Sequence, residues 1–420
     1  MTQLHKKFNT DDVKELFRKY FDKEIKRKHV CEILGIGKTR FFALLKMYRK
    51  SPLKFSIRYK RTFTNNQISQ KIENLILKEL KKEKELILNK EVPINKYNYS
   101  FIKEKLERKY KQKVSLPTII NRAKRYNFYI PKRKNKKEHS REVLTNYIGE
   151  LIQHDTSYHL FSPPAKERWC LITSIDDYSR FILYAKLLKK ETSWAHILAI
   201  QTMFLSYGVP LNFYVDSHSI FRFVQSRDSI WRKHYKLTDE ATSQWKKVLD
   251  DCNVKVIYAL SPQAKGKIER PYRWIQDHLV RLCVEEDITN IRSAQKILNQ
   301  EIYHYNYRRI HSTTKEIPYL RFQRALKEKK SLFREFRIKP PFISPKDIFC
   351  LRVERTVDRY KKISLNNIEL KINNAPWGAK VEIRIYLNLK TDLAEIRVWY
   401  KNKLLDIKKA KLRDLGMVHF

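Results

Sequence analysis

The chain has 420 residues and carries 89 Lys and Arg against 45 Asp and Glu, which leaves a formal net charge of +44. Such an excess favours an anionic partner, either a nucleic acid backbone or an anionic membrane surface. No apolar run reaches the roughly 18 residues of a membrane span, and the N-terminus does not resemble a signal peptide, so we expect no membrane. Five scattered cysteines without a Cys-x-x-Cys pair predict a reducing compartment, with neither disulfides nor structural zinc.

Residues 1–58 are predicted to form a helix-turn-helix DNA-binding domain. Thr10, followed by two aspartates, is expected to begin a capped helix. A glycine-containing turn at residues 35–37 interrupts a helical stripe of apolar residues. The apolar stripe continues after the turn, in a helix that is rich in basic residues. This order lets a second helix enter the major groove. The alternative is an ordinary helical hairpin with a solvated basic face. The candidate DNA contacts here are Lys38, Arg40 and Lys46.

Residues 62–130 predict a second helix-turn-helix domain of winged-helix-like type. A charged helix is expected over about 66–90, another over 99–110, and a third after Ser115 as its cap. Residues 131–146 follow as a basic linker that includes Lys132, Arg133 and Lys134. Such a run can lie along DNA phosphates, although a solvated hinge fits the same composition.

From about residue 147 the pattern changes to short apolar runs that alternate with helices. This order predicts an α/β core over residues 147–325. The expected strands cover 150–156, 169–176, 181–187, 211–215 and 254–258. The expected helices cover 193–207, an insertion around 220–251, 265–286 and 294–327.

Residues 346–412 predict a small all-β barrel. Alternation with period two marks strands at 357–363, 381–386 and 395–399, and a turn is expected at 375–378. We expect Trp377 and Tyr400 to lie in the core of this domain, where they would not stack on bases. The whole chain is therefore expected to be multidomain, with all-α N-terminal modules, an α/β core and an all-β C-terminal domain.

Three carboxylates of the α/β region stand where its pattern would bring them together. Asp155 lies on the first strand, Asp216 just after the fourth, and Glu269 in the first turns of the long helix. Open α/β sheets bind ligands at the carboxyl ends of their parallel strands. Phosphodiester chemistry uses such a set, because two Mg²⁺ ions about 4 Å apart stabilise both the entering and the leaving oxygen. Mg²⁺ prefers oxygen ligands, and Mn²⁺ is the expected substitute.

Each acid also has a plainer interpretation. Glu269 could simply offset the dipole of its helix, and Asp216 could be an ordinary aspartate at a strand end. Asp176 and Asp177 compete with Asp155, but a hairpin turn accounts for them. His154 neighbours Asp155 on a strand and should therefore face the opposite side.

Several motifs resemble one known family. They are residues 152–156 (IQHDT), 175–180 (IDDYSR), 216–222 (DSHSIFR), 261–270 (SPQAKGKIER) and 305–311 (YNYRRIH). They are similar to the DDE transposases of the retroviral-integrase type, and most of all to bacterial ISNCY-type insertion-sequence enzymes. The resemblance covers about 147–325 and implies an RNase H-like core. In that core Asp155, Asp216 and Glu269 would be the catalytic metal ligands.

The chain departs from the family pattern in two places. Asp216 and Glu269 are separated by 52 residues, more than is usual for integrases, and the insertion around 220–251 accounts for the excess. Two residues after Asp216 the wider family often has glycine, whereas this chain has His218. His218 could touch the substrate or stabilise the insertion. Basic residues also surround Glu269, and they could hold DNA phosphates or form a solvated face: Lys265, Lys267, Arg270 and Arg273.

The resemblance implies a transposase that binds terminal inverted repeats, cleaves the transposon ends and joins the 3′-OH to target DNA. Double-stranded DNA would be the partner, and coordination of two ends implies a homodimer or a larger assembly. A cytoplasmic, nucleoid-associated bacterial protein is expected, and no helper ATPase is indicated. Two other functions fit the same residues: a transposase-derived DNA-binding regulator without catalysis, and an RNase H-like nuclease that never joins strands.

Overall fold

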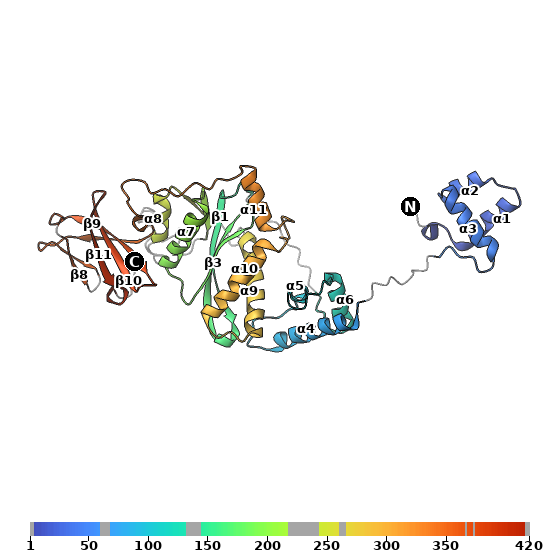
Figure 1. The fold of residues 1–420 in the computed structure, drawn as a ribbon, viewed down its shortest axis with the longest axis horizontal. Helices are drawn as coiled ribbons and strands as arrows, with labels where there is room; N and C mark the ends of the chain where they lie inside the picture. Colours follow the sequence, from blue (N-terminus) through green and yellow to red (C-terminus); the bar gives the residue numbers. More distant parts are fainter. Residues whose placement is uncertain are drawn as a thin grey trace, which may run out of the picture. The chain divides into compact units, whose positions relative to one another are not determined.

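The computed structural model describes residues 4–58, 68–131, 144–216, 243–259, 266–365, 368–372 and 374–415, with the backbone alone at 266–270. The chain divides into two compact units, Met1–Asn74 and Leu75–Phe420, each of which has its own packed interior. Figure 1 shows the helices and strands of both units. No described helix combines the length and the apolar composition that a membrane span requires.

Three helices build most of the first unit: α1 (Thr10–Phe21), α2 (Arg27–Leu34) and α3 (Lys38–Lys50). The cap of α1 is Asn9, one residue before the predicted start, because its side chain accepts the N–H of Asp12. Gly35 ends α2 in the left-handed conformation that glycine adopts without strain. The turn and the basic helix therefore lie where the sequence predicts them.

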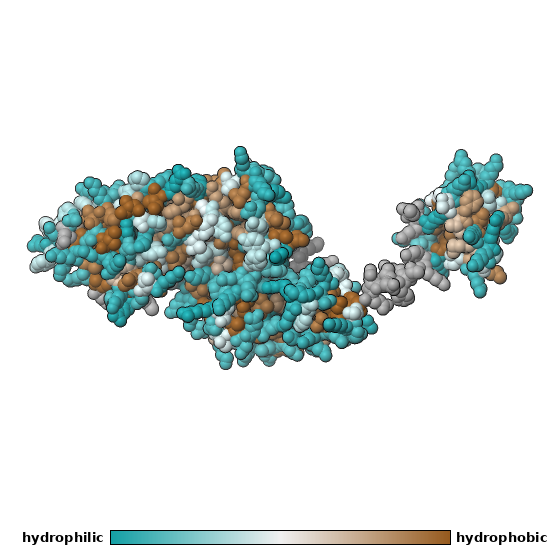
Figure 2. All heavy atoms as spheres, viewed as in Figure 1, coloured by the Kyte–Doolittle hydropathy of each residue, from teal (hydrophilic) through white to brown (hydrophobic). Residues whose placement is uncertain are grey.

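The second unit begins within another helical module. Its helices are α4 (Gln70–Leu88), α5 (Tyr99–Lys109) and α6 (Leu116–Arg125). Asn98 and Ser115 accept backbone N–H groups at the starts of α5 and α6, as good N-caps do. Residues 68–131 contain no strand, so the wing of the predicted winged helix is absent from them. On the face shown in Figure 2, the surface over these helices is largely hydrophilic.

A five-stranded sheet forms the core of the second unit, and its strands match the predicted ones. They are β1 (Leu151–Ser162), β2 (Glu167–Asp176), β3 (Ile182–Leu188), β4 (Asn212–Val215) and β5 (Lys255–Tyr258). The order across the sheet is β3-β2-β1-β4-β5. Strands β1, β2 and β3 pair antiparallel, whereas β4 runs parallel to β1 and β5 parallel to β4. The mixed sheet confirms the predicted α/β class.

Helices cover both faces of this sheet. The helices of the core are α7 (Ser193–Tyr207), α8 (Gln244–Asp251), α9 (Gly266–Glu285), α10 (Ile291–Tyr307) and α11 (Pro318–Lys327). Ile152 and Phe213 pack with residues of α7 and α8 on one face, whereas Leu171 and Ile175 pack with residues of α9 and α10 on the other. Because strand side chains alternate between faces, β1 presents one set of residues to α8 and the next to α9.

The C-terminal region is β-rich, but the barrel prediction is wrong for the described residues. Its elements are α12 (Pro345–Ile348), β6 (Leu351–Thr356), β7 (Lys362–Leu365), β8 (Ile368–Lys371), β9 (Lys380–Asn388), β10 (Leu393–Tyr400) and β11 (Lys403–Lys411). The described strands form an open sheet in the order β11-β10-β9-β6 and a separate β7-β8 pair. An open sheet leaves edge strands, and β11 at one edge is rich in lysine, a common protection against edge pairing.

Two further expectations for this region are also wrong. The strand predicted at 357–363 begins only at Lys362, the first residue of β7. Residues 357–361 form a turn, because the Asp358 carboxylate accepts the N–H groups of Tyr360 and Lys362. Trp377 is not in the core, since 63% of it is exposed on the 375–378 turn. Tyr400 is half-buried against the core, as expected.

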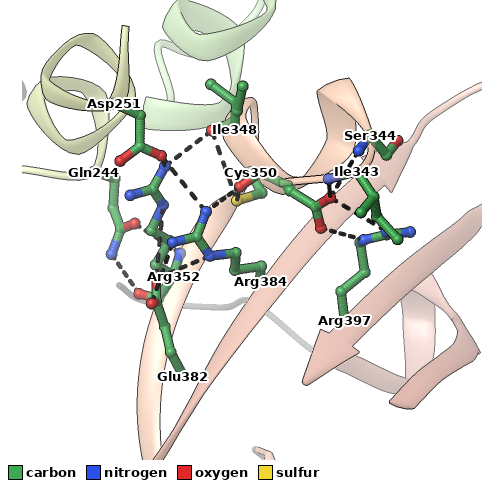
Figure 3. Close-up of polar contacts among 11 residues, drawn as sticks. Gln244, Asp251, Ile343, Ser344, Ile348, Cys350, Arg352, Glu382, Arg384 and Arg397 are labelled. Atoms are coloured by element: carbon green, nitrogen blue, oxygen red, sulfur yellow. Dashed lines mark hydrogen bonds and ion pairs between the residues drawn. The ribbon is translucent and has the colours of Figure 1, made fainter. Parts of the chain in front are cut away.

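Buried ion pairs join the C-terminal sheet to the core (Figure 3). Arg352 of β6 pairs with Asp251 of α8 at 2.5 Å, and the Gln244 side chain bonds both the N–H and the carbonyl of Arg352. Asp347, which is fully buried, pairs with Arg397 of β10 at 2.5 Å. Removing one member of such a pair would leave an unpaired buried charge. The contacts of Arg352 therefore hold the sheet to α8, and the Asp347–Arg397 pair holds α12 to β10.

Candidate functional site

The pairing of β1 with β4 places Asp155 beside Asp216. The last recorded partners in this parallel pair are Gln153 and Tyr214. The same offset of 61 residues, carried two residues further, sets Asp155 opposite Asp216. Neighbouring strands are about 4.8 Å apart, so the two carboxylates stand on adjacent backbones. Both residues are partly exposed, unlike most of the strand residues before them.

Helix α9 packs across β1 on the face that carries Asp155. Burial first, and then the negative charge of Asp155, raises the pKa of the Tyr272 phenol well above its ordinary 10.0. Gln276, one turn further along α9, donates to the Ser157 hydroxyl at 2.7 Å. Gln276 therefore contacts Ser157, and Tyr272 lies near enough to Asp155 to sense its charge, on the face of β1 that Asp155 and Ser157 share.

Position 269 belongs to the same stretch of α9. Its backbone lies in the first turn of the helix, whereas its side chain lies outside the described residues. It stands three residues before Tyr272, which corresponds to about 4.5 Å along the helix axis and the same helical face. The helix thus carries the backbone of the third candidate acid close to the residue that faces Asp155.

Asp176 and Asp177 are the alternative candidates for the first catalytic acid. Their carboxylates already have partners in and around the hairpin between β2 and β3. Asp176 is fully buried and accepts the N–H groups of Gly149 and Ser179, both at 2.8 Å. Burial raises the pKa of Asp176 to about 6, even though these hydrogen bonds lower it. Asp177 pairs with Arg180 at 2.8 Å. These contacts give both aspartates a structural role in the turn.

His154 faces the opposite side of the sheet from Asp155, as the alternation of a strand predicts. It is fully buried, and its ring nitrogens contact the Ser174 hydroxyl at 2.7 Å and the His196 ring at 2.8 Å. His196 in turn contacts Glu191 at 2.8 Å, and the His154 ring stacks on Trp245 of α8. The sequence gives little sign of this polar chain, because His196 lies in an otherwise apolar helix.

The chemistry of the two aspartates suits Mg²⁺ or Mn²⁺. Carboxylate oxygens are hard donors, and partial exposure leaves room for water and phosphate oxygens around a cation. No group of three His, Cys, Asp or Glu gathers as a metal site among the described side chains. The side chain of Glu269 is not among them.

Some of the predicted DNA-contacting residues have described side chains and others do not. Lys38, Arg40 and Lys46 are exposed on α3, and Arg273 is exposed on α9 next to Tyr272. Other candidates lie outside the described residues or have only their backbone described: Lys132, Arg133, Lys134, His218, Lys265, Lys267 and Arg270.

Tyr272 and Gln276 are not among the site residues predicted from the sequence. Helical spacing could have predicted them, because they follow position 269 by three and seven residues, which places all three positions on one helical face. Their contacts with β1 depend on how α9 crosses the sheet, which helical spacing does not reveal.

No protein-family model matches the chain. It is 27% identical over 216 residues to the transposase for insertion sequence IS1202 of Streptococcus pneumoniae, covering 50% of this chain and 45% of that protein. It is 25% identical over 178 residues to y4bF of Sinorhizobium fredii, described as a transposase, covering 42% of this chain and 37% of that protein. It is 27% identical over 314 residues to ORF3 of Spiroplasma virus SpV1-C74, described as an integrase, covering 72% and 81%. The chain is therefore similar to proteins described as transposases and as an integrase of mobile elements.

The chain spans less than half the length of the two bacterial transposases it matches. Among solved structures, the simian T-cell lymphotropic virus intasome with PP2A subunit B56 gamma is 12% identical, with a TM-score of 0.35 over 71% of this chain and 91% of that chain. The HTLV-2 integrase catalytic core with magnesium, in its trimeric form, is 18% identical, with a TM-score of 0.31 over 43% and 98%. Because these TM-scores are low, the fold of this chain is described from its own mixed sheet and not from these neighbours.

Proposed function

We propose that this protein is a transposase that binds the ends of its own mobile element, cleaves them, and joins the new 3′-OH to target DNA. The observation that carries the proposal is the register of β1 and β4, which, continued two residues past its last recorded pair, would bring Asp155 beside Asp216 on the face of β1 that α9 covers. The similarity of the chain to proteins described as a transposase and an integrase supports the proposal.

Asp155, Asp216 and Glu269 would hold two divalent cations. Bound there, Mg²⁺ ions would neutralise the charge that develops on phosphorus and on the entering and leaving oxygens. The chain would contribute the position of the carboxylates: two come from neighbouring strands of a rigid sheet, and the third from a helix packed on that sheet. Arg273, exposed beside Tyr272, would attract the phosphate backbone towards them.

Each chemical step exchanges one oxygen at phosphorus. In the first, a water oxygen displaces the 3′-oxygen at the element end, which leaves a 5′-phosphate on the flanking strand and a 3′-OH on the element. In the second, that 3′-OH displaces the 3′-oxygen of a target phosphodiester. One phosphodiester forms as another breaks, so neither ATP nor a covalent enzyme intermediate is needed.

Recognition of the ends would fall to the helical modules. The basic residues of α3 are exposed and follow a short turn, which is the arrangement of a helix that enters the major groove. Because two ends must be cut and joined together, we propose that a dimer or a larger assembly forms on DNA.

The test uses the full chain and a duplex that carries the ends of its own element. With Mg²⁺ or Mn²⁺, the wild type is expected to nick the ends and give joined product. Asp155→Asn, Asp216→Asn and Glu269→Gln should each lower both activities by about 10²-fold or more and leave end binding intact, because each removes a metal ligand without changing the side-chain shape.

Asp287→Asn is the matched control. Asp287 is exposed and has a φ of 48°, which asparagine tolerates, so the same chemical change should leave activity at the wild-type level. Cleavage that survives Asp155→Asn would remove that residue from the mechanism. Binding without any nicking would favour the regulator, and cleavage without joined product would favour the nuclease.

A further inference from the structure

Helix α9 extends from the candidate site to the module formed by α4, α5 and α6. Position 269 lies in its first turn, whereas Arg281 and Glu285 lie in its last two turns. The residues of α9 between them pack on β1 and α10. One continuous helix therefore carries a candidate catalytic residue at its start and the contacts with the helical module at its end.

Arg281 makes the most deeply buried of these contacts. It is 1% exposed, and its guanidinium lies 3.2 Å from the carboxylate of Glu83, which is 3% exposed on α4. The same guanidinium donates to the carbonyl of Lys96 at 2.8 Å. The Asn98 side chain, at the start of α5, donates to Asp277 of α9. Charges withdrawn from water in this way need their partners, so the contact is costly to open.

A second buried contact joins α5 to α10. The Glu301 side chain is 1% exposed. Its carboxylate lies 2.6 Å from the guanidinium of Arg108 on α5 and 3.1 Å from Nδ1 of His278 on α9. The ring of Phe101 packs edge-on against His278, with a centroid distance of 5.0 Å. Three helices of two different modules thus meet at one buried carboxylate.

Glu285, the last residue of α9, also contacts the helical module. Three lysines of the module surround its carboxylate, with Lys105 at 2.7 Å, Lys109 at 3.1 Å and Lys82 at 3.8 Å. Beneath them, Val280 packs with Val92 and Ile94 in a small apolar cluster. Domain interfaces within a chain usually permit motion unless they are extensive and well buried, and this one combines buried charge with an apolar centre.

The module presents a different face to solvent. Lys124 and Arg125 of α6 are exposed, together with Lys111 and Lys113 before it. Helix α6 starts after a turn and follows α5, so it holds the place of the second helix in a helix-turn-helix. The contacts with α9 and α10 described above come from α4, α5 and the loop between them.

We propose that α9 is a fixed spacer, which sets the distance between DNA held by α6 and the phosphodiester that is cut. The proposal rests on the proposed function. From position 269 to Arg281 the helix advances 12 residues, or about 18 Å, which corresponds to about five base pairs of duplex. Arg281, Glu285 and Glu301 are then positioning residues, because they define where on the DNA the chemistry occurs.

The test is Glu285→Lys, which places a fourth positive charge among three lysines. Its matched control is Glu286→Lys, the same charge change at the exposed neighbouring residue. Hydrogen exchange of the full chain reports whether residues 99–109 leave α9. Cut positions are mapped at single-nucleotide resolution on a duplex with the element's own end. Lys109→Glu combined with Glu285→Lys restores one opposite-charge pair.

Glu285→Lys should raise hydrogen exchange over residues 99–109 and spread the cuts over several phosphodiesters, with at least about a fivefold loss at the wild-type position. End affinity should stay within about threefold, since α6 is untouched. Glu286→Lys should match the wild type, and the double variant should partly restore the single cut position.

Raised hydrogen exchange over residues 99–109 with an unchanged cut position would contradict the proposal that α9 is a fixed spacer. Unchanged hydrogen exchange in Glu285→Lys would show that these ion pairs do not hold the module, and would also overturn it. A wild type that makes no metal-dependent cut would instead remove the proposed function, and the exchange comparison alone would then decide whether the module is held to α9.

Discussion

Four aspartates of the core differ in burial and in hydrogen-bond partners, and these differences indicate which of them could bind a cation. Asp176 and Asp177 are buried in a hairpin turn, where backbone N–H groups and Arg180 occupy their oxygens. Asp155 and Asp216 are partly exposed, Asp155 on β1 and Asp216 directly after the end of the neighbouring strand β4. A cation that keeps several waters needs accessible oxygens, so the second pair suits it and the first does not.

Buried carboxylates also determine how this unit responds to acid. Burial raises the pKa of Glu301, but hydrogen bonds and charge from His278 and Arg108 outweigh it and bring the pKa from 4.5 to about 2. A carboxylate whose pKa is depressed on folding stabilises the fold above its unfolded pKa. That stabilisation is lost as pH falls from about 4.5 towards 2.

We therefore predict that Glu301→Gln destabilises the protein most near neutral pH. The difference in unfolding free energy between wild type and variant should shrink by roughly 3 kcal/mol as pH falls from 6 towards 2. Urea unfolding at a series of pH values measures it. Glu107→Gln serves as the control, because Glu107 is partly exposed and its recorded ion pair is with Lys103 on its own helix. A difference that does not change with pH would contradict the prediction.

Among the elements, the C-terminal strands show where periodicity succeeds and where it fails. Alternation located β9 and β10, because residues such as Ile396 and Val398 bury one face of a regular strand. It failed at residues 357–361, where Asp358 accepts two backbone N–H groups of a turn inside an apparently alternating run. It also failed for Trp377, because a tryptophan in a turn has no sheet face to pack against.

Two tryptophans of this region should therefore differ in their contribution to stability. Trp399 of β10 is 4% exposed and packs against Phe342 with ring centroids 5.8 Å apart, so Trp399→Ala should cost about 3–5 kcal/mol. Trp377→Ala, at 63% exposure, should cost less than about 1 kcal/mol. Thermal unfolding of both variants checks this. Equal losses would mean that Trp377 has a structural role that its exposure conceals.

For the whole molecule, the net charge of +44 governs the strength of DNA binding more than its specificity. The basic residues occur in both units, and they include the exposed cations of α3 and α6. Each phosphate contact releases counterions, so affinity should fall steeply as salt rises.

We predict that Arg40→Ala reduces the slope of log affinity against log salt by about 1, if its guanidinium contacts a phosphate. Lys19→Ala is the control, because the Lys19 ammonium already pairs with Glu15 at 3.3 Å on α1. Fluorescence anisotropy with labelled duplex at several salt concentrations measures both slopes. An unchanged slope for Arg40→Ala would remove that residue from the backbone contacts.

The sequence alone determined the α/β order, the strands of the core and the turn before α3, and it predicted the pairing of Asp155 with Asp216. These features arise from local periodicity, from capping and turn residues, and from motifs that occupy a few consecutive positions. Only the tertiary structure decided that the C-terminal sheet stays open, that Trp377 is exposed, and that α9 joins the candidate site to the α4–α6 module. Such outcomes depend on contacts between residues far apart in the chain, for example Arg281 with Glu83 or Arg352 with Asp251, and no local pattern encodes them.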